Sequence, residues 1–439
     1  MRHQYADDMN TYIHSVSLDK DKCMGCTTCM KHCPTEAIRV HDKRAQIDPD
    51  RCIDCGECIR VCPHKAKKAN YNSFEQIFDY KWKIALPAPT LFAQFDGLDD
   101  IDYVLQGLLD IGFDDVFEVS QAAEFVTSYS RKYLKTNGVK KPVISSACPV
   151  VVRLIALRFP YLKDNIMPLL PPSEVAASMA KKEALKAHPE LKEEDIGVCF
   201  ISPCPAKVSY VKNGFGDYKS QVDLVVPISE VYFRLINVMK RDKAPTITSK
   251  SGIIGVSWAS SGGEASGLLT DRVLAADGIN NVIQVLDEIE NGNIPALDFI
   301  ELNACTGGCV GGVLTIENAF IARNRLQTIR RYMPLSQNDF KESYIPPERF
   351  FDKMPSYKPL SRLSDSVGES MRLMAKIQAV RDELPGIDCG ACGSPMCMSF
   401  AEDVVMGKAD INDCIIIYKD YIKDHIAEKM KTEDNSDDG

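Results

Sequence analysis

The chain has 439 residues, of which 45% are hydrophobic, so it is longer than one ordinary domain and can bury a sizeable core. Its formal net charge of −9 argues against nucleic-acid binding, which requires a basic surface. Seventeen cysteines, no apolar leader and no run of eighteen apolar residues argue against secretion and a membrane span. We therefore expect a cytoplasmic protein of two or three domains whose thiols serve metals or catalysis and not disulfides.

The first predicted domain, residues 1–75, contains a repeated cysteine motif: Cys23-x2-Cys26-x2-Cys29-x3-Cys33-Pro34 recurs as Cys52-x2-Cys55-x2-Cys58-x3-Cys62-Pro63. This spacing is typical of bacterial two-cluster ferredoxins, in which three thiolates of one motif and the fourth of the other hold each 4Fe-4S cubane. We expect one cluster on Cys23, Cys26, Cys29 and Cys62, and the other on Cys52, Cys55, Cys58 and Cys33. Zinc is the alternative for C-x2-C pairs, but the spacing favours clusters.

Two histidines and a basic stretch lie beside these cysteines. With eight thiols assigned, we expect His32 and His64 to be solvated loop residues and not metal ligands. The same interpretation applies to the basic stretch 64–68, which could also orient an acidic electron-transfer partner.

The second predicted domain, residues 76–364, has an α/β pattern. The prolines in Leu86-Pro87-Ala88-Pro89 indicate a linker, because proline is rare inside helices and central strands, and we place the boundary near residue 75. Beyond it, helical and strand periods alternate, which favours a largely parallel sheet. Strands are predicted at 115–119, 143–145, 198–201, 222–226, 252–256 and 299–300, and helices at 101–109, 122–133, 150–159 and 229–240.

Three of these strands lead into loops that contain cysteine. Cys148 and Cys204 each follow a short β-type run, and Cys305 and Cys309 lie in a glycine-rich loop after Phe299-Ile300. Strands of an α/β sheet bring such loops together at its carboxyl edge, so the four thiols are candidate ligands. Glycine lets the loop approach a bulky inorganic group closely, although a simple tight turn is the alternative. Cys148 also precedes a predicted helix, whose N-terminal amides favour a thiolate.

In these loops the sequence resembles the FeFe hydrogenases, whose catalytic domain carries the signatures T-S-C-C-P, M-P-C-x2-K and E-x-M-A-C-x2-G-C-x2-G-G. The corresponding stretches are 145–149, 202–207 and 301–312, with the same order and spacing. The resemblance implies that Cys148, Cys204, Cys305 and Cys309 hold the H-cluster, a 4Fe-4S cubane joined through the last sulfur to a two-iron subsite. The CO, cyanide and dithiolate ligands of that subsite are not made by the protein.

Three residues inside these signatures differ from the family pattern. Ala147 replaces the cysteine that relays a proton, and Ser202 and Asn303 replace two methionines that pack around the two-iron subsite. Such replacements resemble the sensory branch of the family, in which turnover is slow and the hydrogen level is the signal.

The resemblance also implies two catalytic residues. Lys207, three residues after Cys204, resembles the family lysine that hydrogen-bonds a cyanide of the two-iron subsite, a task suited to a compact ammonium group. Glu124 resembles one of two carboxylates in the family's proton path, and Gln121 stands in place of the other. Without the resemblance, Glu124 would be interpreted as a surface carboxylate and Lys207 as a solvated loop lysine.

Proline-rich sequence after residue 345 indicates a third domain, residues 365–430, followed by a disordered tail at 431–439. After a predicted helix at 367–384, the pattern Cys389-x2-Cys392-x4-Cys397-x16-Cys414 resembles a small helical 4Fe-4S domain of some electron-transport subunits and sensory hydrogenases. The remaining cysteine, Cys199, lies in a predicted strand and is expected to be a small buried hydrophobe.

Together these observations predict an FeFe-hydrogenase-like oxidoreductase that splits or forms hydrogen and relays electrons through three accessory 4Fe-4S clusters. The expected fold is an α/β domain with largely parallel sheets, preceded by an α+β ferredoxin-like domain and followed by a helical 4Fe-4S domain. Expected partners are hydrogen, protons and a redox protein such as a ferredoxin or a signalling or redox subunit. The alternatives are a non-catalytic 4Fe-4S electron-transfer or scaffold protein without the two-iron subsite, and a catalytic subunit of a larger redox complex.

Overall fold

The computed structural model describes residues 12–214, 218–239, 244–351, 353, 363–364 and 366–434, with side chains except those of residues 424 and 426–434. The chain separates into two compact units. The large unit comprises the described residues within Met1–Val16, Ile53–Gly56 and Ala69–Lys358, and the small unit those within Ser17–Cys52, Glu57–Lys68 and Pro359–Gly439. No helix of the described chain is long and apolar enough to cross a membrane.

Two parallel sheets form the core of the large unit. The first has the strand order β6-β5-β8-β9, formed by Asp115–Val116, Trp82–Pro87, Ile196–Ser202 and Leu224–Pro227. The second has the order β10-β11-β7, formed by Val273–Asp277, Phe299–Asn303 and Val143–Ile144. Every pair of neighbouring strands in these two sheets is parallel, which confirms the predicted α/β class.

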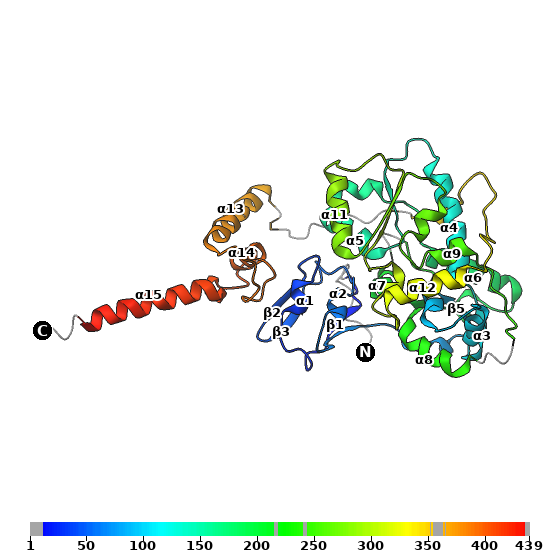
Figure 1. Ribbon diagram of the computed structural model, residues 1–439, viewed down its shortest axis with the longest axis horizontal. Helices are drawn as coiled ribbons and strands as arrows, with labels where there is room; N and C mark the ends of the chain where they lie inside the picture. Colours follow the sequence, from blue (N-terminus) through cyan, green and yellow to red (C-terminus); the bar gives the residue numbers. More distant parts are fainter. Residues whose placement is uncertain are drawn as a thin grey trace. The chain divides into compact units, whose positions relative to one another are not determined.

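Helices cover these sheets, as Figure 1 shows. All seven residues of β8 are buried, because an inner strand of a parallel sheet with helices packed around it has no solvated face. The helices of the large unit are α3 (Asp102–Asp110), α4 (Val119–Leu134), α5 (Pro149–Arg158), α6 (Pro172–Ala187), α7 (Pro205–Asn213), α8 (Ile228–Val238), α9 (Ile253–Ser257), α10 (Gly263–Gly267), α11 (Ile279–Glu290) and α12 (Ala319–Arg330).

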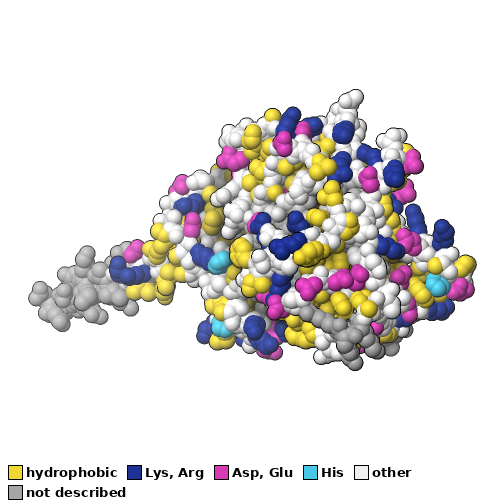
Figure 2. Space-filling model, turned by 45° about the vertical axis from the view of Figure 1, so that its right-hand side comes forward, with side chains coloured by type: hydrophobic (Ala, Val, Ile, Leu, Met, Phe, Trp, Pro, Cys, Tyr) yellow, Lys and Arg dark blue, Asp and Glu magenta, His cyan; other side chains and the backbone are white. Residues whose placement is uncertain are grey.

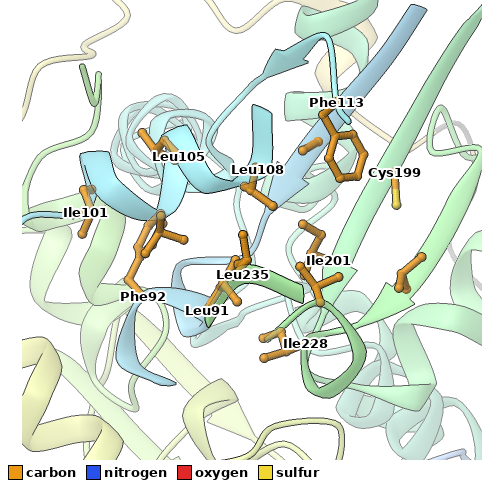
Figure 3. Packing of buried hydrophobic residues seen from close by; sticks show 14 of the residues in the cluster. Leu91, Phe92, Ile101, Leu105, Leu108, Phe113, Cys199, Ile201, Ile228 and Leu235 are labelled. Carbon is orange, nitrogen blue, oxygen red and sulfur yellow. The ribbon is translucent and has the colours of Figure 1, made fainter. Parts of the chain in front are cut away.

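A hydrophobic cluster joins the first sheet to α3 and α8 (Figure 3). Leu105 and Leu108 of α3 and Leu235 of α8 are buried in it together with Ile201 of β8. Cys199 also belongs to this cluster and has no exposed surface, which confirms that it is a small buried hydrophobe. Burial raises the pKa of the Cys199 thiol, so this cysteine stays protonated and inert.

Two sequence predictions in this unit are wrong. The predicted strand 252–256 is helix α9, because the apolar run Ile253-Ile254 packs against α4 so closely that a Cβ at Gly255 would lie 2.0 Å from the Ser120 carbonyl oxygen. Tertiary packing overrides the β-propensity of such a run. The predicted linker at Leu86–Pro89 contains the end of an inner strand, since Pro87 is the last residue of β5.

Other predicted elements agree with the structure, with shifts at their ends. The predicted helix 150–159 is α5, and the predicted helix 229–240 is α8. The strand predicted at 115–119 is shorter than expected, because β6 ends at Val116 and α4 already begins at Val119. The predicted domain boundaries near 75 and 364 remain predictions.

The small unit combines the cysteine repeat, except for the segment Ile53–Gly56 that contains Cys55, with the C-terminal helices. Strands β2 (Ile38–His41) and β3 (Arg44–Ile47) pair antiparallel, and the short helices α1 (Thr28–Lys31) and α2 (Glu57–Arg60) carry Cys29 and Cys58. The C-terminal helices are α13 (Val367–Glu383), α14 (Cys397–Val405) and α15 (Ile415–Asp434). Strands β1 (Val16–Leu18) and β4 (Lys67–Ala69) lie at the edges of the repeat.

The C-terminal predictions are confirmed only in part. The predicted helix 367–384 is α13, but the tail predicted to be disordered from residue 431 begins inside α15, which ends at Asp434. Residues 435–439 and the prolines within 354–362 lie outside the described residues.

Candidate functional site

The central cysteines lie where strands of both sheets end. Cys148 follows β7 and Cys204 follows β8, while Cys305 and Cys309 lie in the loop after β11. Cys148 and Cys204 are each the N-cap of a helix that has proline at its first position, a residue whose missing N–H is not needed there. Each sulfur therefore belongs to a residue at the positive, N-terminal end of a helix dipole.

The glycines around Cys309 allow its loop to pack against two other loops. Gly307 and Gly308 have φ angles of 81° and 90°, in the region that only glycine adopts easily. A Cβ on Gly308 would lie 2.4 Å from the Ser261 nitrogen, and one on Gly312 would lie 2.2 Å from the carbonyl oxygen of Pro203. Because Pro203 precedes Cys204, this close approach brings the Cys309 loop beside the Cys204 loop.

The thiols of Cys148, Cys204 and Cys309 influence one another electrostatically. Burial raises the pKa of Cys204 to about 11 and that of Cys309 to about 12, the neighbouring thiols add to both shifts, and the Lys207 ammonium opposes them. These sulfurs become thiolates when a metal supplies positive charge, so the site suits a metal centre better than a free nucleophile. Cys305 lies on the same loop, four residues before Cys309.

A cavity of about 610 Å³ adjoins Cys309. Its walls include Lys207, Ala147 and Asn303, three of the residues to which the signatures drew attention. The Lys207 ammonium donates to the Ala147 carbonyl oxygen at 3.3 Å and lies 5.8 Å from the centroid of the Phe200 ring. Lys207 is therefore held at the cavity wall and is not a solvated loop lysine.

Two buried carboxyl groups at this cavity were not predicted from the sequence. Glu301 accepts hydrogen bonds from the Gly262 and Ala265 amides and from the Asn303 side chain, at 2.7 to 3.0 Å. Glu264, on α10, accepts from the Ser145 hydroxyl at 2.6 Å, and its Oε1 atom is buried with no hydrogen-bond partner in the part of the chain that the structure describes. The signal available in the sequence was the glutamate that opens the third signature, but Glu264 belongs to none of the three.

Burial and mutual repulsion raise the pKa of Glu264 well above its ordinary value. Burial also raises the pKa of Glu301, while its three hydrogen-bond donors oppose this shift. Hydrogen-bond donors favour the charged carboxylate, and Glu264 has one donor among the described residues, so burial raises its pKa further than that of Glu301. The cavity wall thus carries two buried carboxyl groups whose pKa values are both raised.

The environment of Glu124 contradicts one of its two sequence interpretations, that of a surface carboxylate. Glu124 is buried and not a surface carboxylate, with 2% of its surface exposed. Its carboxylate accepts from the amides of Gly252, Gln337 and Asn338 and from the Asn338 side chain, at 2.7 to 2.9 Å. These four donors tie α4 to two loops, and Glu124 is not among the residues that line the cavity. Its role in proton transfer remains a prediction.

In the small unit, a second cavity of about 330 Å³ is lined by the cysteines predicted for one ferredoxin cluster, Cys23, Cys26, Cys29 and Cys62. Burial raises the pKa of the Cys29 thiol, and the three other thiols of this set add to the shift. Lys67 opposes it. The structure thus brings together the predicted set, including a cysteine from the other repeat.

Lys67 departs from the prediction that the basic stretch 64–68 is solvated. His32 and His64 are exposed as predicted, but only 3% of the Lys67 surface is exposed, and its ammonium has no hydrogen-bond partner among the described residues. The same ammonium opposes the shift that burial produces in Cys58, whose pKa is raised to about 12. Lys67 therefore acts on thiols of both predicted ferredoxin sets.

Electrostatic effects between thiols are resolved for only some of the remaining predicted ligands. Cys33 contributes to the raised pKa of Cys58, which places these two members of the second set near each other. In the C-terminal set, burial raises the pKa of Cys392, and Cys414 and Cys389 add to the shift. Cys397 and Cys414 are buried in one hydrophobic cluster.

The residues present fit iron-sulfur groups on three observations. One cavity is lined by four thiols, the donors that 4Fe-4S clusters require. The buried ammonium of Lys67 acts on these thiols and has no hydrogen-bond partner among the described residues, as expected if a negatively charged cluster provides one. At the cavity beside Cys309, two buried oxygen atoms, Thr90 Oγ1 and Glu264 Oε1, likewise have no protein partner among the described residues.

Comparison with known protein families gives three matches. The profile described as "Iron only hydrogenase large subunit, C-terminal domain" matches residues 83–269 and 239–313. The profile "4Fe-4S dicluster domain" matches residues 15–63, and "Putative Fe-S cluster" matches residues 384–416. The three matches fall on the three regions in which the sequence predicts clusters.

Comparison with solved structures also gives matches. A variant of the FeFe-hydrogenase HydA1 from Chlamydomonas reinhardtii is similar over 57% of this chain and 84% of its own, with 17% identity and a TM-score of 0.46. HydA(deltaEFG), in a structure described as revealing stepwise H-cluster assembly, is similar over 60% of this chain and 86% of its own, with 17% identity and a TM-score of 0.45. A search of curated proteins finds no match.

Proposed function

Because the family match extends over residues 83–313 of 439, this chain belongs to the iron-only hydrogenase large-subunit family, and we propose that it splits or forms hydrogen at an H-cluster held by Cys148, Cys204, Cys305 and Cys309. The single observation that carries the proposal is the cavity beside Cys309, whose wall brings together Lys207 and a protonatable carboxyl pair. A bare cubane would need neither. The H-cluster would supply the low-valent iron that side chains cannot provide.

In this proposal the protein holds the group and controls its surroundings. Cys309 would be the sulfur nearest the two-iron part, because it is the only one of the four cysteines among the described residues that line the 610 Å³ cavity. Lys207 offers its ammonium as a hydrogen-bond donor to a cyanide ligand, in addition to its bond to the Ala147 carbonyl. Apolar walls such as Phe200, Val119 and Trp258 exclude water and strengthen these interactions.

Glu264 and Glu301 are the groups that move protons at this cavity. Ala147 has a methyl group where the family has a proton-relaying cysteine, so it can neither donate nor accept. Glu264 lines the same cavity, its pKa is raised well above the ordinary value, and its Oε1 atom has no hydrogen-bond partner among the described residues, so it is suited to carry a proton. Glu301, which accepts from three donors, would take up the proton in return.

We further propose that turnover is slow and that the protein senses hydrogen. Support comes from Ala147 and from Asn303, whose amide is committed to Glu301 at 2.7 Å where the family has an apolar methionine. Ser202 is likewise committed, since its hydroxyl accepts from the Cys204 amide at 3.2 Å. The three accessory 4Fe-4S clusters relay electrons to a redox or signalling partner in the cytoplasm.

The test is an infrared spectrum of the protein after maturation, because metal-bound CO and cyanide absorb where protein groups do not. We expect these bands in the wild type and their loss in Cys309→Ser, with the ferredoxin-like clusters retained. Cys199→Ser is the matched control, since that buried cysteine is no ligand and should leave the bands unchanged. A matured wild type without bands, or bands that survive Cys309→Ser, would refute the proposal and favour a scaffold that carries only cubanes.

A further inference from the structure

The C-terminal part of the small unit packs against its ferredoxin-like part through charged residues of opposite sign. Arg39, on β2, pairs with Asp403 on α14 at 2.5 Å, and Arg51 pairs with Glu402 at 2.5 Å. These are not loose surface pairs, because the two arginine side chains are only 14% and 12% exposed and the two carboxylates 8% and 20%.

One face of α14 provides this surface. Ser399, Glu402 and Asp403 are spaced i, i+3 and i+4, so they lie on one side of the helix. The Ser399 hydroxyl donates to the carboxylate of Glu36, next to the two arginine pairs. The carboxylate of Asp403 also accepts a hydrogen bond from the Ser394 hydroxyl at 2.8 Å, so its position does not depend on Arg39 alone.

The loop that carries Cys389 and Cys392 makes a second set of contacts, through backbone. The Val40 amide donates to the Gly393 carbonyl oxygen at 2.8 Å, and the Lys31 ammonium donates to the carbonyl oxygens of Asp388 and Pro395. A Cβ at Gly393 would lie 2.0 Å from the Val40 carbonyl oxygen. Only glycine permits so close an approach.

These contacts place the two cysteine sets next to each other. Gly393 follows Cys392, and its partner Val40 lines the cavity that also contains Cys23, Cys26, Cys29 and Cys62. Gly390 follows Cys389, and a Cβ there would lie 3.1 Å from the Met30 side chain, which follows Cys29. Two independent contacts therefore join residues adjacent to ligands of one set with residues adjacent to ligands of the other.

We propose that α14 and the loop 388–395 form a docking surface for the ferredoxin-like part, and that the Cys389–Cys414 cluster exchanges electrons with the cluster of Cys23, Cys26, Cys29 and Cys62. One electron leaves the reduced cluster and enters the oxidised one, and no bond is made or broken. The inference rests on the proposed function only for the presence of the clusters.

The test is a charge-swap cycle on Arg51 and Glu402, followed by magnetic coupling between clusters. The chain with its clusters loaded is reduced chemically, and electron paramagnetic resonance measures the coupling between the C-terminal cluster and the Cys23–Cys62 cluster. We expect coupling in the wild type, its weakening in Arg51→Glu and in Glu402→Arg, and its return in the double variant. Arg372→Glu, an equal charge change on the exposed face of α13, should leave it unchanged.

Hydrogen exchange of residues 388–405 gives a second readout that does not require iron. It should become faster in each single variant and return to the wild-type rate in the double variant. Wild-type coupling and exchange in both single variants, or losses that the double variant does not restore, would overturn the docking surface. Coupling without infrared bands would refute the hydrogenase site alone, and bands without coupling would refute the docking alone.

Discussion

Among single residues, Glu264 and Glu301 carry the largest functional consequence. They line the cavity that Ala147 also lines, and burial raises the pKa of Glu264 well above its ordinary value, although the Ser145 hydroxyl donates to this carboxyl group. The protein thus keeps an acid at the site although the expected cysteine is absent. The acid is attached to α10 and not to the loop of the first signature.

Glu264→Gln should lower hydrogen turnover by roughly 10²- to 10⁴-fold, because a positioned acid or base contributes about that much and an amide cannot replace it. The infrared bands should persist, since the side chain keeps its size and is no ligand. Hydrogen evolution with a strong reductant measures the effect. Glu118→Gln is the control: Glu118 is equally buried, bonded to Ser249 and Ser251, and does not line the cavity. Equal rates in the two variants would exclude Glu264 as the proton carrier.

The raised pKa of Glu264 also predicts a pH dependence of stability. A carboxyl whose folded pKa lies above its unfolded value near 4.5 contributes stability that is present below that value and lost as pH rises through the folded pKa. Each unit of difference corresponds to about 1.4 kcal/mol. Glu264→Gln should therefore gain stability relative to wild type from about pH 5 upward. Denaturant midpoints of equally loaded proteins between about pH 4 and 8 measure this, and parallel curves would contradict it.

Lys67 should set the reduction potentials of both ferredoxin-like clusters. Its buried ammonium has no hydrogen-bond partner among the described residues and acts on Cys29 and on Cys58. A positive charge nearby favours the reduced cluster, so Lys67→Gln should shift both potentials to more negative values. Redox titration followed by electron paramagnetic resonance measures them. Lys65→Gln makes the same charge change on an exposed side chain, and an equal shift in that control would show a general surface effect.

At the scale of elements, the glycine loop after β11 decides whether Cys309 reaches its place. Gly307 and Gly308 both have positive φ angles, but their surroundings differ. At Gly307 the nearest atom to an added Cβ would be 3.5 Å away, whereas at Gly308 it would be 2.4 Å away. Gly308 therefore differs from Gly307 in its close packing, and its ψ angle of −156° also places it in a backbone conformation essentially restricted to glycine.

Gly307→Ala should cost only the left-handed backbone strain of roughly 1–2 kcal/mol. Gly308→Ala would force alanine into a backbone conformation (φ 90°, ψ −156°) that is essentially restricted to glycine, and would add a clash with the backbone at Ser260 and Ser261. It should therefore also displace Cys309 and remove the CO and cyanide bands. Thermal midpoints and infrared spectra of both variants measure these effects. If Gly308→Ala keeps the bands and is no less stable than Gly307→Ala, the close packing is not required.

Helices and strands could be predicted from the sequence where a short apolar run lies next to a residue, such as proline, that marks the end or the start of an element. Strand β8 before Ser202 and helix α5 after Cys148-Pro149 follow from such local patterns. Helix α9 did not, because its β-branched run is held as a helix by contact with α4, more than a hundred residues earlier in the chain. The Glu264–Glu301 pair could not be predicted for the same reason. Helix α10 and strand β11 bring together two carboxyl groups that no local sequence spacing connects.

For the whole molecule, the relay should be separable from the chemistry. Deleting the chain after about Ser364 removes α13 to α15 and one cysteine set, so iron should fall by about four per chain, as for one cubane. The infrared bands should persist, because the central cysteines and the cavity belong to the large unit. Iron analysis and infrared spectra of the truncated protein measure both. Loss of the bands would mean that the deleted part supports the large unit.

Because the central cysteines lie on loops of two different sheets, the cluster occupancy should depend on whether both sheets are correctly folded. Cys148 and Cys309 belong to loops after strands of the second sheet, whereas Cys204 follows a strand of the first. A bound cluster would bridge the two sheets, and its binding energy would favour only conformations in which both are formed. A packing defect in either sheet, even one far from the cysteines, would then lower the cluster occupancy, and with it the visible absorbance of the purified protein, before the protein unfolds.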